Sequence, residues 1–120
     1  MQEHAGHLAD LDESLFLGRL DDYAGGVPVL RAADMSNALT ESAQHGSRPL
    51  SEVLARCLFL RRRVVGRLEE LPRSAFAKIA QHPRLGVPMR LVDLMLFQAE
   101  HDDYHLAKIT ELRRSLEMSR

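Results

Sequence analysis

The chain has 120 residues, 45% of them hydrophobic and 28% charged, with a formal net charge of −1. Such a length suits one domain with one core, and near-neutrality argues against a general nucleic-acid binder, whose affinity depends on clustered positive charge. With no apolar run long enough to cross a membrane, an acidic N-terminus unlike a signal peptide and a single cysteine, Cys57, we expect a cytoplasmic protein without membrane or nucleic-acid partners.

The apolar residues recur at the spacing of helices, and no stretch alternates apolar and polar residues for long enough to form a strand. We therefore predict an all-α fold in a single domain, residues 1–120. The first helix is expected over about Glu3–Tyr23, where an apolar stripe is flanked by acidic residues. Gly25-Gly26, followed by Pro28, then ends this helix.

The segment 27–47 carries the weakest signal in the chain. A short helix over about Ala33–Gln44, capped by Asp34 or Ser36 and stopped by Gly46, is one interpretation. A partly irregular connection is the other. The sequence leaves this choice open.

A second long helix is predicted over Pro49–Leu71, because apolar residues recur there at helical spacing and proline suits the first turn of a helix. Arg61-Arg62-Arg63 interrupts the apolar stripe. We interpret this triplet as a solvated face whose aliphatic stems cover apolar surface, with an anion-facing arginine as the alternative. A short helix at about Ser74–Ala80 and a loop at His82–Pro88 lead to the last helix.

The last helix is predicted over Met89–Met118. Its first turns, Leu91–Phe97, are apolar almost all the way round, which is typical of a helix buried on every side. Further along, His101 and His105 are four residues apart and so point to the same side. On a buried stripe they need polar partners, which one shared metal ion or carboxylates and carbonyls of the core would supply.

If the first and last helices pack antiparallel, as bundle helices commonly do, His7 would face His101 and His105. Three protein ligands with an open fourth position are the pattern of catalytic zinc sites, and imidazole also suits nickel, copper and iron. Ligating histidines usually donate their other ring N–H to a carboxylate or carbonyl. The nearby polar candidates are Asp10, Glu13, Gln98, Glu100 and Asp102.

Three segments resemble the motifs of one known family. Residues 3–13 resemble the His-Leu-Ala-Asp helix of the DinB-like (DinB/YfiT) superfamily, residues 82–86 its His-Pro-x-x-Gly loop, and residues 99–109 its terminal H-x-x-x-H helix. The matches follow the family's order and span nearly the whole chain. This resemblance implies an up-down four-helix bundle with a divalent metal, zinc or nickel foremost. The metal ligands that it implies are His7, His101 and His105.

The same resemblance implies a chemistry. Members of the family include thiol-dependent S-transferases and isomerases that use low-molecular-weight thiols such as bacillithiol or mycothiol, and others are classed as metal-dependent hydrolases. We therefore expect a small electrophilic substrate, with Asp10 or Glu13 to orient a group or accept a proton. His82 would contact the substrate or cap its loop, and His4, which does not match the ligand position, is the second choice as a ligand. The alternative function is a non-catalytic bundle that acts through dimerisation.

We expect the chain to depart from the family pattern in one respect, because the helix that precedes the His-Leu-Ala-Asp helix in the family has no counterpart in these 120 residues. Either the gene begins further upstream, or the bundle lacks one helix and completes itself otherwise. Three long helices would leave part of the apolar surface uncovered, and covering it favours a homodimer. Leu96 and Phe97 are the predicted anchors of that interface.

Overall fold

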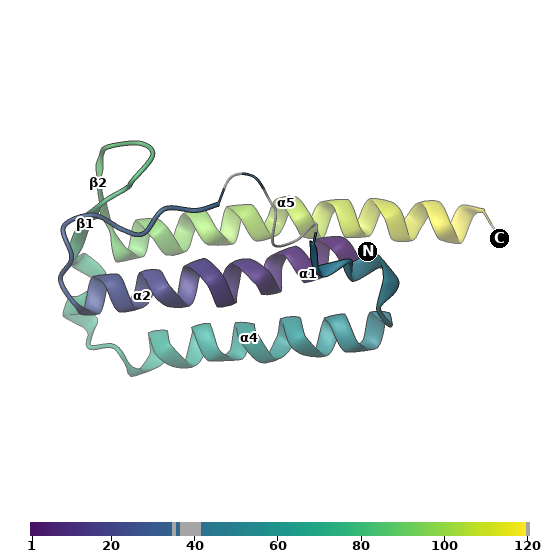
Figure 1. Ribbon diagram of the computed structural model, residues 1–120, viewed down its shortest axis with the longest axis horizontal. Coiled ribbons are helices and arrows are strands. Elements are labelled where there is room, and N and C mark those ends of the chain that lie inside the picture. Colours follow the sequence, from purple (N-terminus) through teal and green to yellow (C-terminus); the bar gives the residue numbers. More distant parts are fainter. Residues whose placement is uncertain (35, 37–41, 120) are drawn as a thin grey trace.

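The structure is a computed structural model that describes residues 1–34, 36 and 42–119. Its four α-helices among these residues are α1 (Gln2–Leu11), α2 (Leu17–Ala24), α4 (Leu50–Glu70) and α5 (Leu91–Met118). They lie side by side and make up most of the molecule (Figure 1). The predicted all-α class is therefore confirmed.

α1 and α2 form one rod, because a π-helical turn, η1 (Asp12–Phe16), joins them without a break. In this wider turn the N–H of Leu17 donates to the carbonyl of Asp12. The predicted first helix is thus confirmed, except that it contains this turn. The rod ends at Gly25, and Gly26 follows with a φ of +68°, which glycine adopts without strain.

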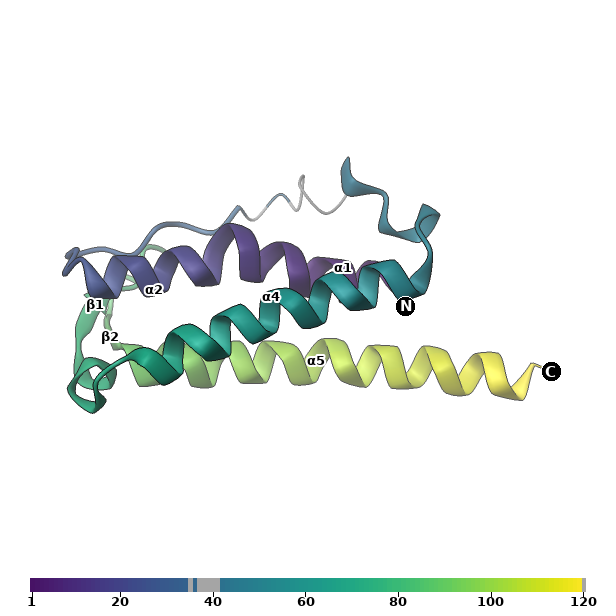
Figure 2. The ribbon, with the colours of Figure 1, turned by 90° about the horizontal axis from the view of Figure 1, so that it is seen from below.

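The rod lies between α4 and α5 in Figure 1, and Figure 2 shows α4 crossing beside it. The rod and α4 run in one direction and α5 runs back, so the antiparallel packing expected for the first and last helices is present. Leucines from every long element meet between them, and burying such side chains contributes about 1.5–3 kcal/mol each. The core includes Leu20, Leu60, Leu91 and Leu94.

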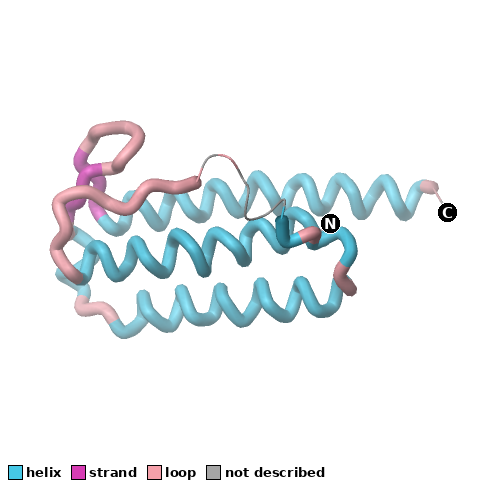
Figure 3. Tube along the Cα trace, in the orientation of Figure 1, coloured by secondary structure: helices cyan, strands magenta, loops and turns pink. Residues whose placement is uncertain are grey.

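A small hairpin connects α4 to α5 at one end of the bundle (Figure 3). After α4, a 3-10 turn, η3 (Arg73–Ala77), precedes β1 (Ile79–Gln81), which pairs antiparallel with β2 (Pro88–Arg90). The register places Ala80 opposite Met89. The predicted short helix over residues 74–80 is therefore wrong in its second half.

The strand forms because segments distant in the sequence supply its hydrogen bonds. The N–H of Leu30 donates to the carbonyl of Gln81 at 3.0 Å, and the N–H of Gln81 donates to the carbonyl of Pro28 at 2.8 Å. Local periodicity carries no information about such pairing. The rest of the connection between α2 and α4 includes a 3-10 turn, η2 (His45–Ser47). The helix considered for residues 33–44 falls largely on positions 35 and 37–41, which lie outside the described residues.

The early part of α5 is only half covered. Leu91 and Leu94 are buried in the core, whereas Val92, Leu96 and Phe97 are exposed, Leu96 to 62%. The prediction that this stretch is buried on every side is wrong within one chain, because the packed neighbours of α5 occupy one side of it. None of the described helices is both long enough and apolar enough to cross a bilayer.

Asp22 fixes the chain that leaves the rod. Its Oδ2 accepts hydrogen bonds from the backbone N–H and the Nε of Arg31, each at 3.0 Å, and its Oδ1 accepts one from Nη2 at 3.0 Å. The side-chain hydrogen bonds from Arg31 are the main reason why the pKa of Asp22 lies below its usual 3.8. The ion pair therefore stabilises the folded chain only while Asp22 is ionised.

We expect Asp22→Asn to lower the free energy of unfolding at pH 7 by about 1–3 kcal/mol, the usual cost of losing hydrogen bonds to a charged group. Because the pKa of Asp22 is lower in the folded than in the unfolded chain, the ion pair stabilises the fold fully at pH values above the unfolded-state pKa. This stabilisation is lost as the pH falls through the folded-state pKa of Asp22. Urea unfolding of both proteins at pH 7 and pH 3 measures the effect. A difference between wild type and variant that does not shrink at pH 3 would contradict it.

Candidate metal centre

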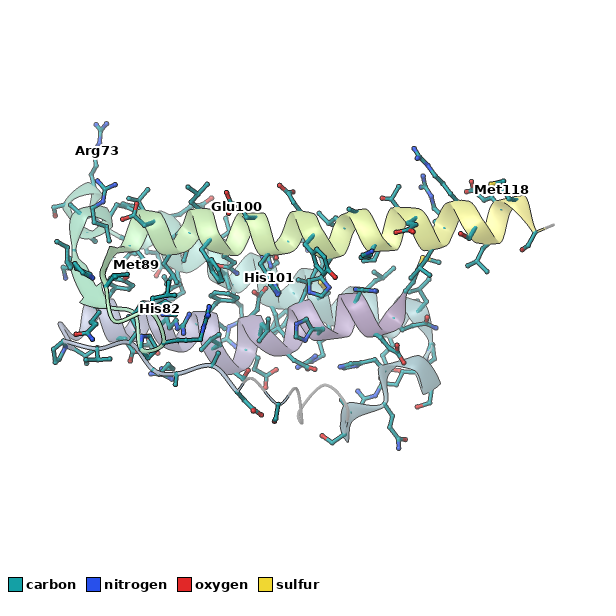
Figure 4. The ribbon with its side chains drawn as sticks, turned by 90° about the horizontal axis from the view of Figure 1, so that it is seen from above. Arg73, His82, Met89, Glu100, His101 and Met118 are labelled. Carbon is teal, nitrogen blue, oxygen red and sulfur yellow. The ribbon has the colours of Figure 1, made fainter. Side chains whose placement is uncertain are left out.

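Three histidines from two helices converge in the middle of the bundle. His7 comes from α1, while His101 and His105 lie one turn apart on α5, and one nitrogen of each ring lies within 4.8 Å of the others. The ring centroids are 5.6 Å apart for His7 and His101, 4.9 Å for His7 and His105, and 4.6 Å for His101 and His105. Figure 4 shows His101 on the side of α5 that faces the rod. The structure thus brings together the three predicted ligands.

The surroundings keep these imidazoles in their neutral form. Burial is the main cause that lowers the pKa of each ring, and it acts together with the neighbouring histidines to lower the pKa of His105 to about 4. Nδ1 of His101 is buried and has no hydrogen-bond partner among the described residues. A buried nitrogen that lacks a partner costs stability unless something binds it. Neutral rings with a buried nitrogen left over fit a divalent cation.

A fourth histidine adjoins this cluster. Nδ1 of His4 lies 2.8 Å from Nδ1 of His105, so one of the two nitrogens carries the shared proton. His4 is not among the residues whose ligand atoms all lie within 4.8 Å of one another. His4 was predicted only as the second choice for a metal ligand, and here it contacts His105, one of the three first choices.

The two carboxylates predicted to act at the site both contact Arg56. Asp10 is buried, and its two oxygens lie 2.8 Å from Nε2 of His45 and 2.8 Å from Nη1 of Arg56. Glu13 is exposed and accepts from Nη2 of Arg56 at 2.9 Å. The charge of Asp10 also acts on the cluster, because it raises the pKa of His7 against the effect of burial.

Gly6 explains how His45 reaches Asp10. A Cβ at this position would lie 2.2 Å from the ring of His45, which is closer than atoms can approach. Glycine in the first helix therefore makes room for the buried imidazole. The helix segment that carries His4 and His7 thus also makes room, at Gly6, for the turn His45–Ser47.

One group of charged residues was not found from the sequence. Asp12 is 1% exposed, accepts from Nε of Arg61 at 2.9 Å and from Nε2 of Gln98 at 2.9 Å, and Arg61 also pairs with Asp102. Burial raises the pKa of Asp12, although the hydrogen bond from Arg61 opposes this effect. Arg61 therefore ties the rod to α5 one residue from His101.

The interpretation of the arginine triplet as a solvated face is accordingly wrong for Arg61, which instead fits the alternative of an anion-facing arginine. The available signal was the position of Arg61 on the apolar stripe of its helix. Only the packing of three helices shows that Arg61 meets Asp12 and Asp102.

A family model of the DinB superfamily matches residues 1–109. The chain belongs to the DinB superfamily. A solved structure of YfiT from Bacillus subtilis, described as a probable metal-dependent hydrolase with an unusual four-helix bundle topology, matches with a TM-score of 0.79 and 25% sequence identity. The match covers 97% of this chain and 66% of the YfiT chain, so the chain spans just under two thirds of that protein. None of the curated proteins matches it.

In this DinB-superfamily chain, a cavity of about 390 Å³ opens beside two of the three histidines. His7 and His101 form one part of its wall, and His82 forms another. Nδ1 of His82 accepts the backbone N–H groups of Arg84 at 3.2 Å and Leu85 at 3.1 Å, so the ring proton lies on Nε2. His82 therefore caps its loop, and it also lines the cavity, so both predicted roles fit its position.

Proposed function

We propose that this chain is the catalytic domain of a metal-dependent enzyme that holds a divalent ion, zinc or nickel, with His7, His101 and His105. The observation that carries the proposal is the set of three neutral imidazoles, one with a buried nitrogen that has no described partner, beside a cavity. Membership of the DinB superfamily and the likeness to YfiT, a probable metal-dependent hydrolase, support it.

The reaction that we propose is hydrolysis of a small substrate, or transfer of a low-molecular-weight thiol to a small electrophile. Such an ion supplies Lewis acidity and a lowered pKa for a bound water or thiol. The residues of the chain provide binding and orientation. Arg61 holds α5 against the rod and so positions His101 and His105, while the apolar cavity wall limits the access of water.

The other predicted residues take narrower parts in this proposal. Nε2–H of His82 is a donor on a ring that lines the cavity, suited to an oxygen of the substrate. Asp10 is a positioning residue, because it acts on His7 through its charge and holds His45 and Arg56. Glu13 forms an ion pair with Arg56. That Glu13 accepts a proton in the reaction stays a prediction.

Single-turnover assays with zinc-loaded and nickel-loaded protein test this function. A p-nitrophenyl ester reports hydrolysis, and cysteine with 1-chloro-2,4-dinitrobenzene reports thiol transfer. We expect the loaded wild type to exceed the His101→Ala, His105→Ala double variant in at least one assay, and the need for thiol distinguishes the two reactions. Equal rates for both proteins in both assays would contradict the proposal.

Exposed apolar side chains favour a second proposal, association with a second copy of the chain. Leu54, Leu58 and Val65 follow each other at helical spacing on α4, and Val92 and Leu96 do so on α5. Soluble proteins seldom leave apolar patches beyond a few hundred Å² uncovered, and the commonest closed solution is a two-fold dimer. Association would cover this surface whether or not the bundle is catalytic.

We therefore expect light scattering at low micromolar concentration to give the mass of a dimer for the wild type and of a monomer for Leu96→Asp, Phe97→Asp. Because Phe97 also lines the cavity, Leu96→Asp alone is the cleaner companion variant. Leu106→Asp, on an exposed leucine further along α5, is the matched control and should stay dimeric. A monomeric wild type would exclude the dimer.

A further inference from the structure

Arg19, on α2, is an almost fully buried cation. It is 2% exposed, and its Nε donates to the carbonyl of Arg31 at 3.1 Å. Among the described residues, its terminal nitrogens have no hydrogen-bond or ion-pair partner. Arginine is almost never buried without a counter-ion, and guanidinium does not lose its proton in proteins. An anion at these nitrogens would therefore offset the cost of burying the charge.

The nearest carboxylate does not serve as that anion. Both oxygens of Asp22 bind Arg31, as described above. Burial lowers the pKa of Arg19, and the charge of Asp22 offsets part of this effect, whereas Tyr23, with a pKa of about 12, is uncharged at neutral pH. The neighbours of Arg19 thus compensate only part of the cost of its burial.

Arg19 lines the cavity that reaches His7 and His101. The other cationic side chain of the wall, Arg84, is exposed, and together with Arg19 it adds to burial in lowering the pKa of His82. Asp34 also lines the cavity. Its Oδ1 accepts hydrogen bonds from the backbone N–H of Ser36 at 2.9 Å and from the hydroxyl of Ser36 at 2.6 Å.

Asp34 is not among the groups whose charge acts on the pKa of Arg19. The part of the cavity near Arg19 is therefore positive, and the charge of Asp22 compensates it only in part. The rest of the wall is largely apolar, with Leu11, Leu15, Phe16 and Phe97.

We propose that this cavity binds a small monocarboxylate, with its carboxylate on the terminal nitrogens of Arg19, its apolar body against the leucine and phenylalanine walls, and its other end at His7 and His101. This inference rests on the proposed function, because it names the substrate class of that site. The two nitrogens of a guanidinium end match the two oxygens of a carboxylate. One buried positive charge also matches one negative charge better than the two of a phosphomonoester. A cavity of about 390 Å³ suits a ligand of this size.

Titration calorimetry of the metal-free protein in EDTA at pH 8 tests this, because neither a metal ion nor charged imidazoles then compete for the carboxylate. The probes are phenylacetate and hexanoate, each with its neutral amide. We expect the wild type to bind at least one acid at least tenfold more tightly than its amide. We expect Arg19→Gln to remove this preference and Arg19→Lys to retain part of it.

Arg73→Gln is the matched control, since it removes the same charge at an exposed position outside the cavity lining, and it should keep wild-type binding. Figure 4 shows Arg73 projecting from the molecule, away from His82 and His101. Equal binding of acid and amide by the wild type, or binding of neither, would overturn the inference. So would unchanged acid binding in a folded Arg19→Gln. If that variant does not fold, the comparison of acid with amide on the wild type decides.

The His101→Ala, His105→Ala variant separates this inference from the proposed function. We expect it to lose the metal but retain the preference for the acid. A wild type that binds acids but no metal would refute the enzyme proposal alone. A metal-binding wild type without preference for the acid would refute the carboxylate site alone.

Discussion

Replacing His101 and His105 together with alanine should abolish stoichiometric binding of zinc or nickel. The single ring that remains, His7, is too weak a ligand to hold a divalent ion at micromolar concentration. Metal content after loading and gel filtration measures the effect. Added metal should also raise the melting temperature of the wild type and leave that of the variant unchanged, because an ion that binds only the folded state stabilises it.

His7→Ala should have the same effect, whereas His4→Ala, on the ring that touches His105, should do little to stoichiometry. Binding by the wild type should persist at pH 7 and weaken below about pH 6, since only neutral imidazole ligates and its ordinary pKa is ~6.5. The lowered pKa values of the three rings place proton competition on the acid side of that value. Equal metal content in the wild type and the double variant would refute the three-histidine site.

Arg61→Met should destabilise the fold by about 3–5 kcal/mol, the usual cost of breaking a buried ion pair by removing one partner. Asp12 is 1% exposed, and the loss of Arg61 would leave it with Gln98 as a hydrogen-bond donor among the described side chains. The hydrogen bonds to Asp102 and Asp12 raise the pKa of Arg61 although burial lowers it, so the arginine is charged at every accessible pH. Its loss therefore leaves an uncompensated carboxylate.

Urea unfolding followed by circular dichroism measures this loss. Arg62→Met, on the exposed neighbouring residue, is the matched control and should change stability by less than about 0.5 kcal/mol. Adding Asp12→Asn to Arg61→Met removes the stranded charge and should restore part of the stability. Equal stabilities of the two single variants would show that Arg61 is not a structural residue.

The sequence predicts the helical parts of this molecule well, because a helix declares itself through local spacing. Because His101 and His105 are four residues apart on one helix, helical spacing alone places them on the same side of α5. The antiparallel packing of α5 against the rod then brings His7 to them. The resemblance to the DinB superfamily, confirmed by the family model, gave the same three residues. Local periodicity and motif order therefore sufficed for the core of the candidate site.

The features that the sequence did not predict all depend on contacts between distant segments. The hairpin strand at Ile79–Gln81 takes its hydrogen bonds from the chain near Pro28 and Leu30. Arg61 meets Asp12 and Asp102, which lie 49 and 41 residues away in the chain. The exposure of Leu96 likewise follows from which side of α5 the other helices occupy.

The π-helical turn in the rod sets the rotation about the helix axis between two residues that line the cavity. His7 and Arg19 are separated by twelve positions, which in an uninterrupted α-helix amounts to about 120° of rotation away from a common face. A π-turn accommodates about one extra residue, or about 100° of that rotation, and so leaves the two side chains within about 20° of each other. Both line the same cavity. The π-turn thus brings an imidazole and a guanidinium from positions twelve residues apart onto the same side of one rod, so that both face one cavity.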